Sequence, residues 1–201
     1  MATDIGQRRF TVDEYERMAK LGIIGPDEKV ELIEGTIVTV PPSGEDHSSG
    51  ITRLNHHFVV RFSGRAIVQS QLPVRVSDNS LPEPDVAILR YDEQYYGKRR
   101  PRASDVLALV EVSYSSVAFD AGAKLRAYAR AGVSEYWIVN VRDNRIVVHR
   151  DPNDLGFATQ REIGAGGRIA FLAFPGDTFS AEEIMPTVGE PPELETDYTA
   201  K

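Results

Sequence analysis

The sequence contains no cysteine among its 201 residues. This excludes disulfide bonds, zinc sites with cysteine ligands and catalysis by a thiol, and it is consistent with a reducing compartment. No apolar run approaches the roughly 18 residues that a membrane-spanning helix needs. The N-terminal stretch MATDIGQRRF also lacks the apolar segment of a secretory signal. We therefore expect a cytoplasmic protein with no membrane segment.

Several catalytic motifs are missing as well. The sequence has neither the glycine-rich phosphate loop that ends in Lys-Ser or Lys-Thr nor the Gly-x-Ser-x-Gly motif of hydrolases. Its histidines are His47, His56, His57 and His149, and none of them forms the His-x-x-x-His pair typical of zinc sites. His47 stands near the start of a predicted helix, from which it could face an acidic cluster or a phosphate.

Positive charge is also scarce, because 23 Lys and Arg residues face 30 Asp and Glu residues and the net charge is −7. This balance disfavours strong non-specific binding to nucleic acids, which depends on basic side chains. Compact sites for divalent metals are themselves acidic, however, and a local basic patch can coexist with a negative total. The best candidate patch is Lys98, Arg99, Arg100 and Arg102. The alternative is that this run is an ordinary solvated loop.

The composition that remains is that of a globular protein, with 41% hydrophobic and 26% charged residues. The length permits one sizeable core or at most two small domains. We expect a single domain over residues 1–185. The segment 186–201 is rich in Pro and Glu and contains little that can pack, which predicts a mobile tail.

The hydrophobic pattern predicts an α/β fold in which helices flank a mixed β-sheet, with peripheral hairpins. Helices are predicted at 11–20, from about 47 to 62, from 115 or 116 to 132, and as a short segment capped at Ser180. Strands are predicted at 29–33, 36–40, 66–70, 72–76, 85–89, 106–112, 136–141, 145–149, 157–163 and 168–174. The order strand 106–112, helix, strand 136–141 indicates a parallel pair.

Two acidic residues stand at the ends of predicted strands. Glu111 lies within the apolar run Leu107-Ala-Leu-Val-Glu-Val112, where a carboxylate is costly unless a cation or good donors meet it. Asp85 precedes the apolar residues Val86 and Ile88. Two carboxylates on neighbouring strands can hold Mg²⁺ or Mn²⁺ through oxygen ligands. Alternatively, Glu111 faces water at a strand edge and Asp85 is an ordinary turn residue.

A cation and a third acid could complete this group. Lys124 and Tyr128 are four residues apart on a predicted helix and therefore share a face. If that face packs on the sheet, the acids would be the natural partner of the lysine. Otherwise Lys124 extends to solvent. On the first hairpin we prefer Glu31 to Glu34 as the inward acid, because Glu34 belongs to the turn with Gly35. Surface charge is the alternative for both.

Several segments resemble a known family in their order and spacing. They are Val30-Glu-Leu-Ile-Glu-Gly35, Pro84-Asp85-Val86, Leu109-Val-Glu-Val-Ser113, Asp120 through Lys124 to Tyr128, and Ala131-Gly-Val-Ser-Glu-Tyr-Trp137. They are similar to the Uma-type restriction endonucleases, a branch of the PD-(D/E)XK nuclease superfamily, over about residues 10 to 185. The resemblance implies that Asp85 and Glu111 are the motif acids and that Glu31 is the N-terminal acid that completes the metal site. It also implies that Lys124 replaces the lysine expected at position 113, where this chain has serine.

The resemblance implies a metal-dependent endonuclease that hydrolyses phosphodiester bonds, with DNA as the expected substrate. Asp85 and Glu111 would bind Mg²⁺ or Mn²⁺, and Lys124 would orient the attacking water or stabilise the transition state. A homodimer suits cleavage of both strands of a duplex. The main alternative is an inactive protein of the same fold that serves as an interaction or regulatory module. A hydrolase acting on small phosphate compounds is a third, weaker reading.

Overall fold

A six-stranded mixed sheet organises the molecule in this computed structural model, which describes residues 6–41 and 44–186. The strand order is β3-β4-β5-β6-β7-β8, and only the central pair β5–β6 is parallel. The strands are β3 (Ala66–Ser70), β4 (Val86–Arg90), β5 (Val106–Ser113), β6 (Glu135–Asn140), β7 (Arg145–Asn153) and β8 (Gly156–Ile163). The expected α/β fold and its parallel pair are thus confirmed.

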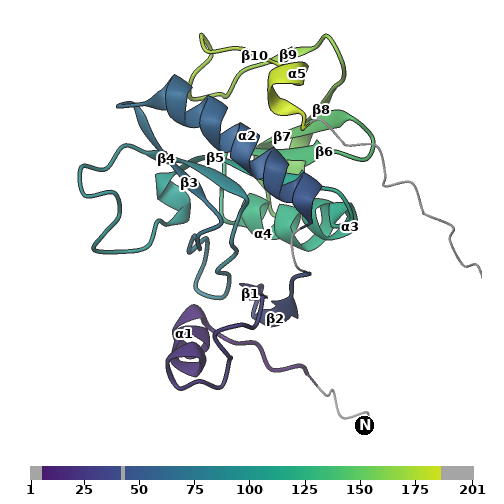
Figure 1. Ribbon diagram of the computed structural model, residues 1–201. Helices are drawn as coiled ribbons and strands as arrows, with labels where there is room; N and C mark the ends of the chain where they lie inside the picture. The colour runs from purple at the N-terminus through teal and green to yellow at the C-terminus, as the bar shows by residue number, and fades with distance from the viewer. Residues whose placement is uncertain (1–5, 42–43, 187–201) are drawn as a thin grey trace, which may run out of the picture.

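Helix α2 (Glu45–Phe62) covers one face of the sheet (Figure 1). Its apolar residues recur every three or four positions, so they form one stripe that packs on the strands. These residues are Ile51, Leu54, Phe58 and Phe62. The helix comes close to β5 at Gly50, where a Cβ atom would lie 2.9 Å from Val112 Cγ1. The small residue therefore allows the second turn of α2 to lie beside the end of β5.

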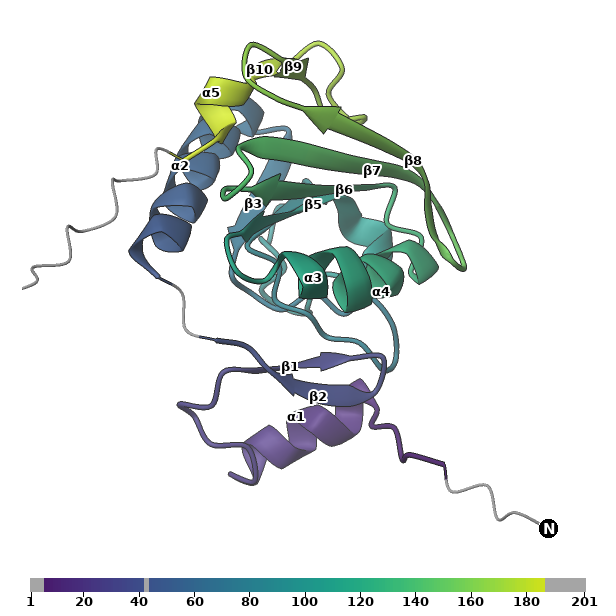
Figure 2. The same cartoon turned by 90° about the vertical axis from the view of Figure 1, so that its right-hand side faces the viewer.

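The opposite face carries the helical segment that connects β5 to β6 (Figure 2). This segment consists of α3 (Val117–Phe119), a π-helical turn (Asp120–Lys124) and α4 (Leu125–Arg130). Tyr128 packs there with Leu109 and Tyr136 in a second core. Because side chains alternate along a strand, β5 sends Leu109 to this face and Val110 to the α2 face.

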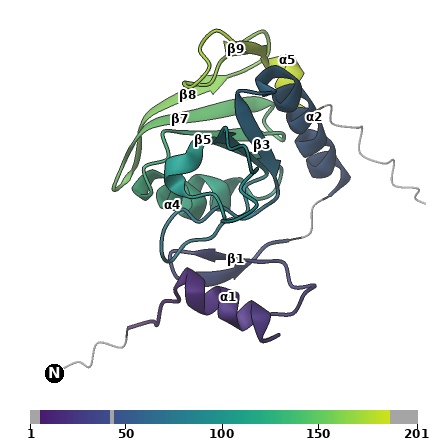
Figure 3. The ribbon, with the colours of Figure 1, turned by 90° about the vertical axis from the view of Figure 1, so that its left-hand side faces the viewer.

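The N-terminal part forms a small unit of its own beneath the connecting helices (Figure 3). It consists of α1 (Val12–Lys20) and the antiparallel hairpin β1 (Val30–Ile33) and β2 (Thr36–Thr39). Thr11 and Glu14 form the predicted capping box. Leu32 is buried with Val12 and Leu81, and its carbonyl accepts a hydrogen bond from Leu81 N. These contacts fix β1 against the loop that leads to β4.

The C-terminal part closes the α2 side with two short strands and a short helix. They are β9 (Arg168–Ile169), β10 (Phe179–Ser180) and α5 (Ala181–Ile184), with Ser180 in the predicted capping box. The predicted tail over 186–201 falls almost wholly outside the described residues. Over the described part of the chain, no helix combines the length and apolar character needed to cross a bilayer.

Two predicted strands were wrong. Residues 72–76 form no strand, because Val74 N and Val76 N bond to the carbonyls of Pro82 and Ser80 in the next loop. The strand predicted at 168–174 ends at Ile169, and a turn in which Phe174 N bonds to Phe171 O follows it. The helical stretch predicted from 115 or 116 to 132 is confirmed over residues 117–130, although a π-helical turn lies in its middle.

Candidate active site

Asp85 and Glu111 meet at one end of the sheet. β4 and β5 are antiparallel with Val86 opposite Val110, so the residue before β4 lies beside the last residues of β5. Val112 N donates a hydrogen bond to Asp85 Oδ2 at 2.8 Å, and Asp85 N donates to Glu111 Oε2 at 3.3 Å. Glu111 is 2% exposed and Asp85 is 7% exposed. The two predicted acids are therefore adjacent and buried.

Lys124 and Tyr128 reach the same glutamate from the opposite layer. Lys124 Nζ donates to Glu111 Oε1 at 3.0 Å, and Tyr128 OH donates to the same oxygen at 2.8 Å. Lys124 is the last residue of the π-helical turn and is only 4% exposed. Such turns are frequent at functional sites. The helical spacing of the two residues thus places both on the face that packs on the sheet.

Glu31 enters this group from the N-terminal hairpin. Its Oε1 atom lies 3.1 Å from Lys124 Nζ, so the ammonium group bridges Glu31 and Glu111. Its other oxygen, Oε2, is buried and has no hydrogen-bond partner among the residues that the structure describes. Glu34, the rejected alternative, is more exposed and pairs with Arg130.

His47 approaches Asp85 from the first turns of α2. Its Nε2 atom lies 3.0 Å from Asp85 Oδ2, and this hydrogen bond raises the pKa of the imidazole. The side chains of His47 and Asp85 are 20% and 10% exposed, whereas those of Glu31, Glu111 and Lys124 are at most 5% exposed. Solvent therefore reaches this group from the side of His47 and Asp85.

Asp120 is a fourth buried acid to which the sequence assigned no role. Its Oδ2 atom accepts hydrogen bonds from the hydroxyls of Ser113 and Ser116, both at 2.6 Å. Ser113, at the position where the superfamily pattern has lysine, thus holds a carboxylate. The four-residue spacings of Ser116, Asp120 and Lys124 were the available signal, because they align along one helix face.

Negative charge exceeds positive charge in this cluster, which we call the acidic centre: Glu31, Asp85, Glu111, Asp120 and Lys124. Burial raises the pKa of Glu111 well above its ordinary value, and it also raises the pKa values of Glu31 and Asp120. Burial alone would lower the pKa of Lys124, but the surrounding carboxylates outweigh it and raise that pKa. The lysine stays charged, and four carboxyl groups share this one ammonium.

The acidic centre fits a hard divalent cation by charge and donor type. Asp85 and Glu111 supply carboxylate oxygens, which Mg²⁺ and Mn²⁺ prefer, and Glu31 Oε2 is an unpartnered buried acceptor. Within residues 6–41 and 44–186, however, no three acidic or histidine side chains already converge as metal ligands. Lys124 lies between Glu31 and Glu111 and contacts both. Glu31 is therefore separated from the Asp85–Glu111 pair by the ammonium group.

The predicted basic patch is partly neutralised by ion pairs. Arg99 pairs with Asp105, and Arg100 pairs with Glu16 on α1. No such pair forms for Lys98 or Arg102 within the described residues. Half of the run is therefore engaged in holding the loop between β4 and β5 in place.

Comparisons with known proteins support the family and the fold. A family model named Uma2, described as "Putative restriction endonuclease", matches residues 12–182. A solved structure from Anabaena variabilis, titled as a "putative nuclease belonging to DUF820", superposes with a TM-score of 0.66 at 15% sequence identity. The match covers 87% of this chain and 97% of the other, and it shows the shared fold. The search of curated proteins gave no match.

Proposed function

Because the chain belongs to the Uma2 family of restriction endonuclease-like proteins, we propose that it is a metal-dependent endonuclease that hydrolyses phosphodiester bonds in DNA. The observation that carries the proposal is the contact of Lys124 with Glu111, next to Asp85, in a buried centre with too few cations. Such an arrangement costs stability unless a ligand compensates it. Perturbed acids of this kind concentrate at functional sites.

Asp85 and Glu111 are the proposed metal ligands, with Mg²⁺ or Mn²⁺ as the ion. When bound, the ion polarises the phosphate and lowers the pKa of a coordinated water. Glu31 acts from the outer shell, because its Oε1 atom already accepts the Lys124 ammonium. Asp120 is held away by two serine hydroxyls and adds negative charge without serving as a ligand.

Lys124 is the proposed catalytic cation. Its ammonium group stays charged in this environment and can stabilise the negative charge that develops on the phosphate, or orient the attacking water. Glu31 keeps Lys124 in position through their ion pair. Tyr128 keeps Glu111 in position by donating a hydrogen bond to it. A preorganised donor of this kind needs no rearrangement during the reaction.

His47 is a positioning residue in this proposal. Its bond to Asp85 Oδ2, together with that of Val112 N, holds the carboxylate in one orientation. The buried Nδ1 atom of His47 has no partner in the described part of the chain. The imidazole lies on the more solvent-exposed side of the centre, where substrate would enter.

The proposal also includes a DNA substrate and a dimeric assembly. Lys98 and Arg102 are the cations of the basic run left to contact a DNA backbone. A symmetric homodimer would present two centres to the two strands of a duplex. The absence of cysteine is consistent with a cytoplasmic location.

Cleavage of supercoiled plasmid tests the proposal. We expect the wild type and an Arg126→Ala control to nick or linearise plasmid with Mg²⁺ or Mn²⁺, and not with a chelator. Arg126 is exposed and lies on the same helix as Tyr128, so it controls for lost helix charge. Asp85→Ala and Lys124→Ala should leave the plasmid uncut over the time in which the wild type cleaves it. Equal cleavage by all four proteins would identify a contaminant and defeat the proposal.

An inactive nuclease-fold module is the second candidate, favoured by Ser113 at the position of the motif lysine. In that case the wild type would leave plasmid intact with either ion, although Lys124 contacts Glu111. Binding of a DNA duplex without cleavage would then be the expected property.

A further inference from the structure

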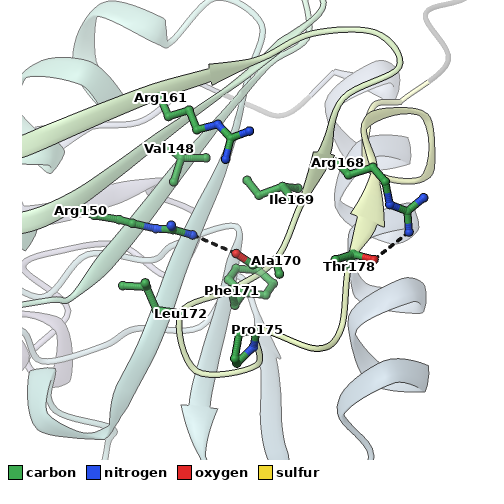
Figure 4. Close-up of a pocket in the computed structure, with 10 residues that line it drawn as sticks. All are labelled: Val148, Arg150, Arg161, Arg168, Ile169, Ala170, Phe171, Leu172, Pro175 and Thr178. Atoms are coloured by element: carbon green, nitrogen blue, oxygen red, sulfur yellow. Dashed lines mark hydrogen bonds between the residues drawn. The ribbon is translucent and has the colours of Figure 1, made fainter.

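A second polar site lies in the cavity between β7–β8 and the segment 168–178 (Figure 4). Its volume is about 270 Å³. Three arginines line it, namely Arg150, Arg161 and Arg168. All other residues of the lining are uncharged: Val148, Ile169, Ala170, Phe171, Leu172, Pro175 and Thr178. A cavity with arginines and no acid in its lining is unusual for a chain whose net charge is −7.

The sheet separates this cavity from the acidic centre. Val148 belongs to the core beneath α2, whereas Tyr128, which bonds to Glu111, belongs to the core on the other face. The cavity is therefore a distinct site, and an inference about it does not depend on the proposed nuclease chemistry.

Arg150 is held rigidly at the edge of the cavity. Its Nε and Nη2 atoms donate to Glu135 Oε1 at 2.9 and 2.7 Å, and Nη2 also donates to Ala170 O at 2.9 Å. Glu135 is fully buried, so it lies behind the guanidinium and not in the cavity. Nη1 is left to bind a ligand, and its orientation is fixed in advance.

Arg161 and Arg168 supply positive charge that is not engaged in a direct ion pair with the described residues. Neither forms an ion pair with any of the described residues, and both side chains are exposed. Arg168 Nη2 donates to Thr178 Oγ1 at 2.7 Å. Figure 4 shows the Arg161 guanidinium directed toward the space between Val148 and Ile169. The cavity therefore combines one fixed guanidinium with two unpaired ones.

We propose that this cavity binds a phosphate group, carried either by a free nucleotide or by the end of a nucleic acid strand. The planar guanidinium matches the oxygens of phosphate through paired hydrogen bonds. Ile169, Phe171 and Leu172 offer an apolar surface for the attached sugar or base. The volume lies near the lower limit of the roughly 300–1,000 Å³ typical of ligand pockets, which fits a small group better than a duplex.

Calorimetric titration of the full chain, without divalent metal, tests this inference. The probes are inorganic phosphate, dAMP, and a short single-stranded oligonucleotide with and without a 5′-phosphate. The variants are Arg161→Gln and Arg161→Gln/Arg168→Gln, with Arg126→Gln as the matched control on the other face of the sheet. Arg150 is left intact because it anchors Glu135. Equal melting temperatures would show that all variants are folded.

We expect Arg161→Gln to weaken binding about tenfold, as for the loss of one charge-assisted hydrogen bond, and the double variant to weaken it further. Arg126→Gln should bind like the wild type. A loss seen with phosphate and dAMP identifies a nucleotide as the ligand, and a loss confined to the 5′-phosphorylated oligonucleotide identifies a strand end. No binding by the wild type, or equal binding by the Arg161 and Arg126 variants, would overturn the inference.

Discussion

Two buried glutamates on neighbouring parallel strands have opposite surroundings. Glu135, at the start of β6, is 0% exposed and receives hydrogen bonds from Trp137 Nε1, Arg150 and Leu172 N. Both of its oxygens are satisfied, and one guanidinium balances its charge. Glu111, near the end of β5, shares a single ammonium with three further acids. Burial alone therefore does not indicate function, but unbalanced buried charge does.

The largest expected effect is on cleavage by Lys124→Ala. Removing the one cation of the acidic centre should slow cleavage by about 100- to 1,000-fold, since it removes a preorganised donor at developing negative charge. Single-turnover cleavage of a duplex in Mg²⁺, with Arg126→Ala alongside, measures this. A Lys124→Ala rate within a few-fold of the control would show that the ammonium serves the fold alone.

Glu135→Gln should have its effect on stability instead. It leaves the partly buried Arg150 guanidinium without its counter-charge, which costs about 3 kcal/mol in the free energy of unfolding, the low end for a buried ion pair. Urea denaturation measures the loss. Cleavage per folded molecule should match the wild type, because Glu135 lies far from the acidic centre. Glu135 is at the start of β6, whereas the other end of β6, at Asn140, pairs with Ser113 beside the acidic centre. If Glu135→Gln were as stable as the wild type but had lost cleavage, Glu135 would have a functional role and not a structural one.

Divalent ions should stabilise the protein by balancing the charge of the acidic centre. At a concentration 100-fold above its dissociation constant, Mn²⁺ should add about 2.7 kcal/mol to the free energy of unfolding. Thermal melting with and without Mn²⁺ checks this, and Asp85→Asn should lose the shift while Glu135→Gln keeps it. An equal shift in wild type and Asp85→Asn would place the ion elsewhere.

The smallest effect concerns His149, a buried residue whose Nε2 atom has no hydrogen-bond partner among the described residues. Burial is the one cause of its pKa shift. Burial lowers its pKa below the ordinary 6.5. The unfolded chain therefore binds the proton first as pH falls, and folding stability declines below about pH 6.5. His149→Phe should reduce this decline in denaturation curves at pH 7 and 5.5. The same substitution should leave cleavage unchanged. A loss of cleavage would show that the buried, unpartnered Nε2 atom of His149 has a functional role.

Local patterns predicted most of the fold. The capping residues Thr11 and Ser180, the apolar stripe of α2 and the apolar run of β5 each depend on neighbours close in sequence. The prediction at 72–76 failed for an instructive reason. Val74 and Val76 are buried as the alternation required, but their backbone bonds go to a loop that doubles back on them.

The acidic centre was only partly predictable. Strand ends and helix spacing identified Asp85, Glu111 and Lys124, and alternation in the hairpin favoured Glu31. Nothing local indicated that Ser113 would hold Asp120, because that bond depends on how the π-helical turn lies over β5. The bond from Leu172 N to Glu135 joins residues 37 positions apart, and no periodicity reports such a contact.

Glu111→Gln tests the central claim most directly when cleavage and unfolding are measured on one preparation. The substitution keeps the shape of the side chain and replaces one of the four clustered carboxyl groups with a neutral amide. Our account predicts that cleavage is lost, while the free energy of unfolding without metal stays the same or increases. Wild-type cleavage, or a destabilisation as large as that of Glu135→Gln, would contradict it and make Glu111 another structural ion-pair partner.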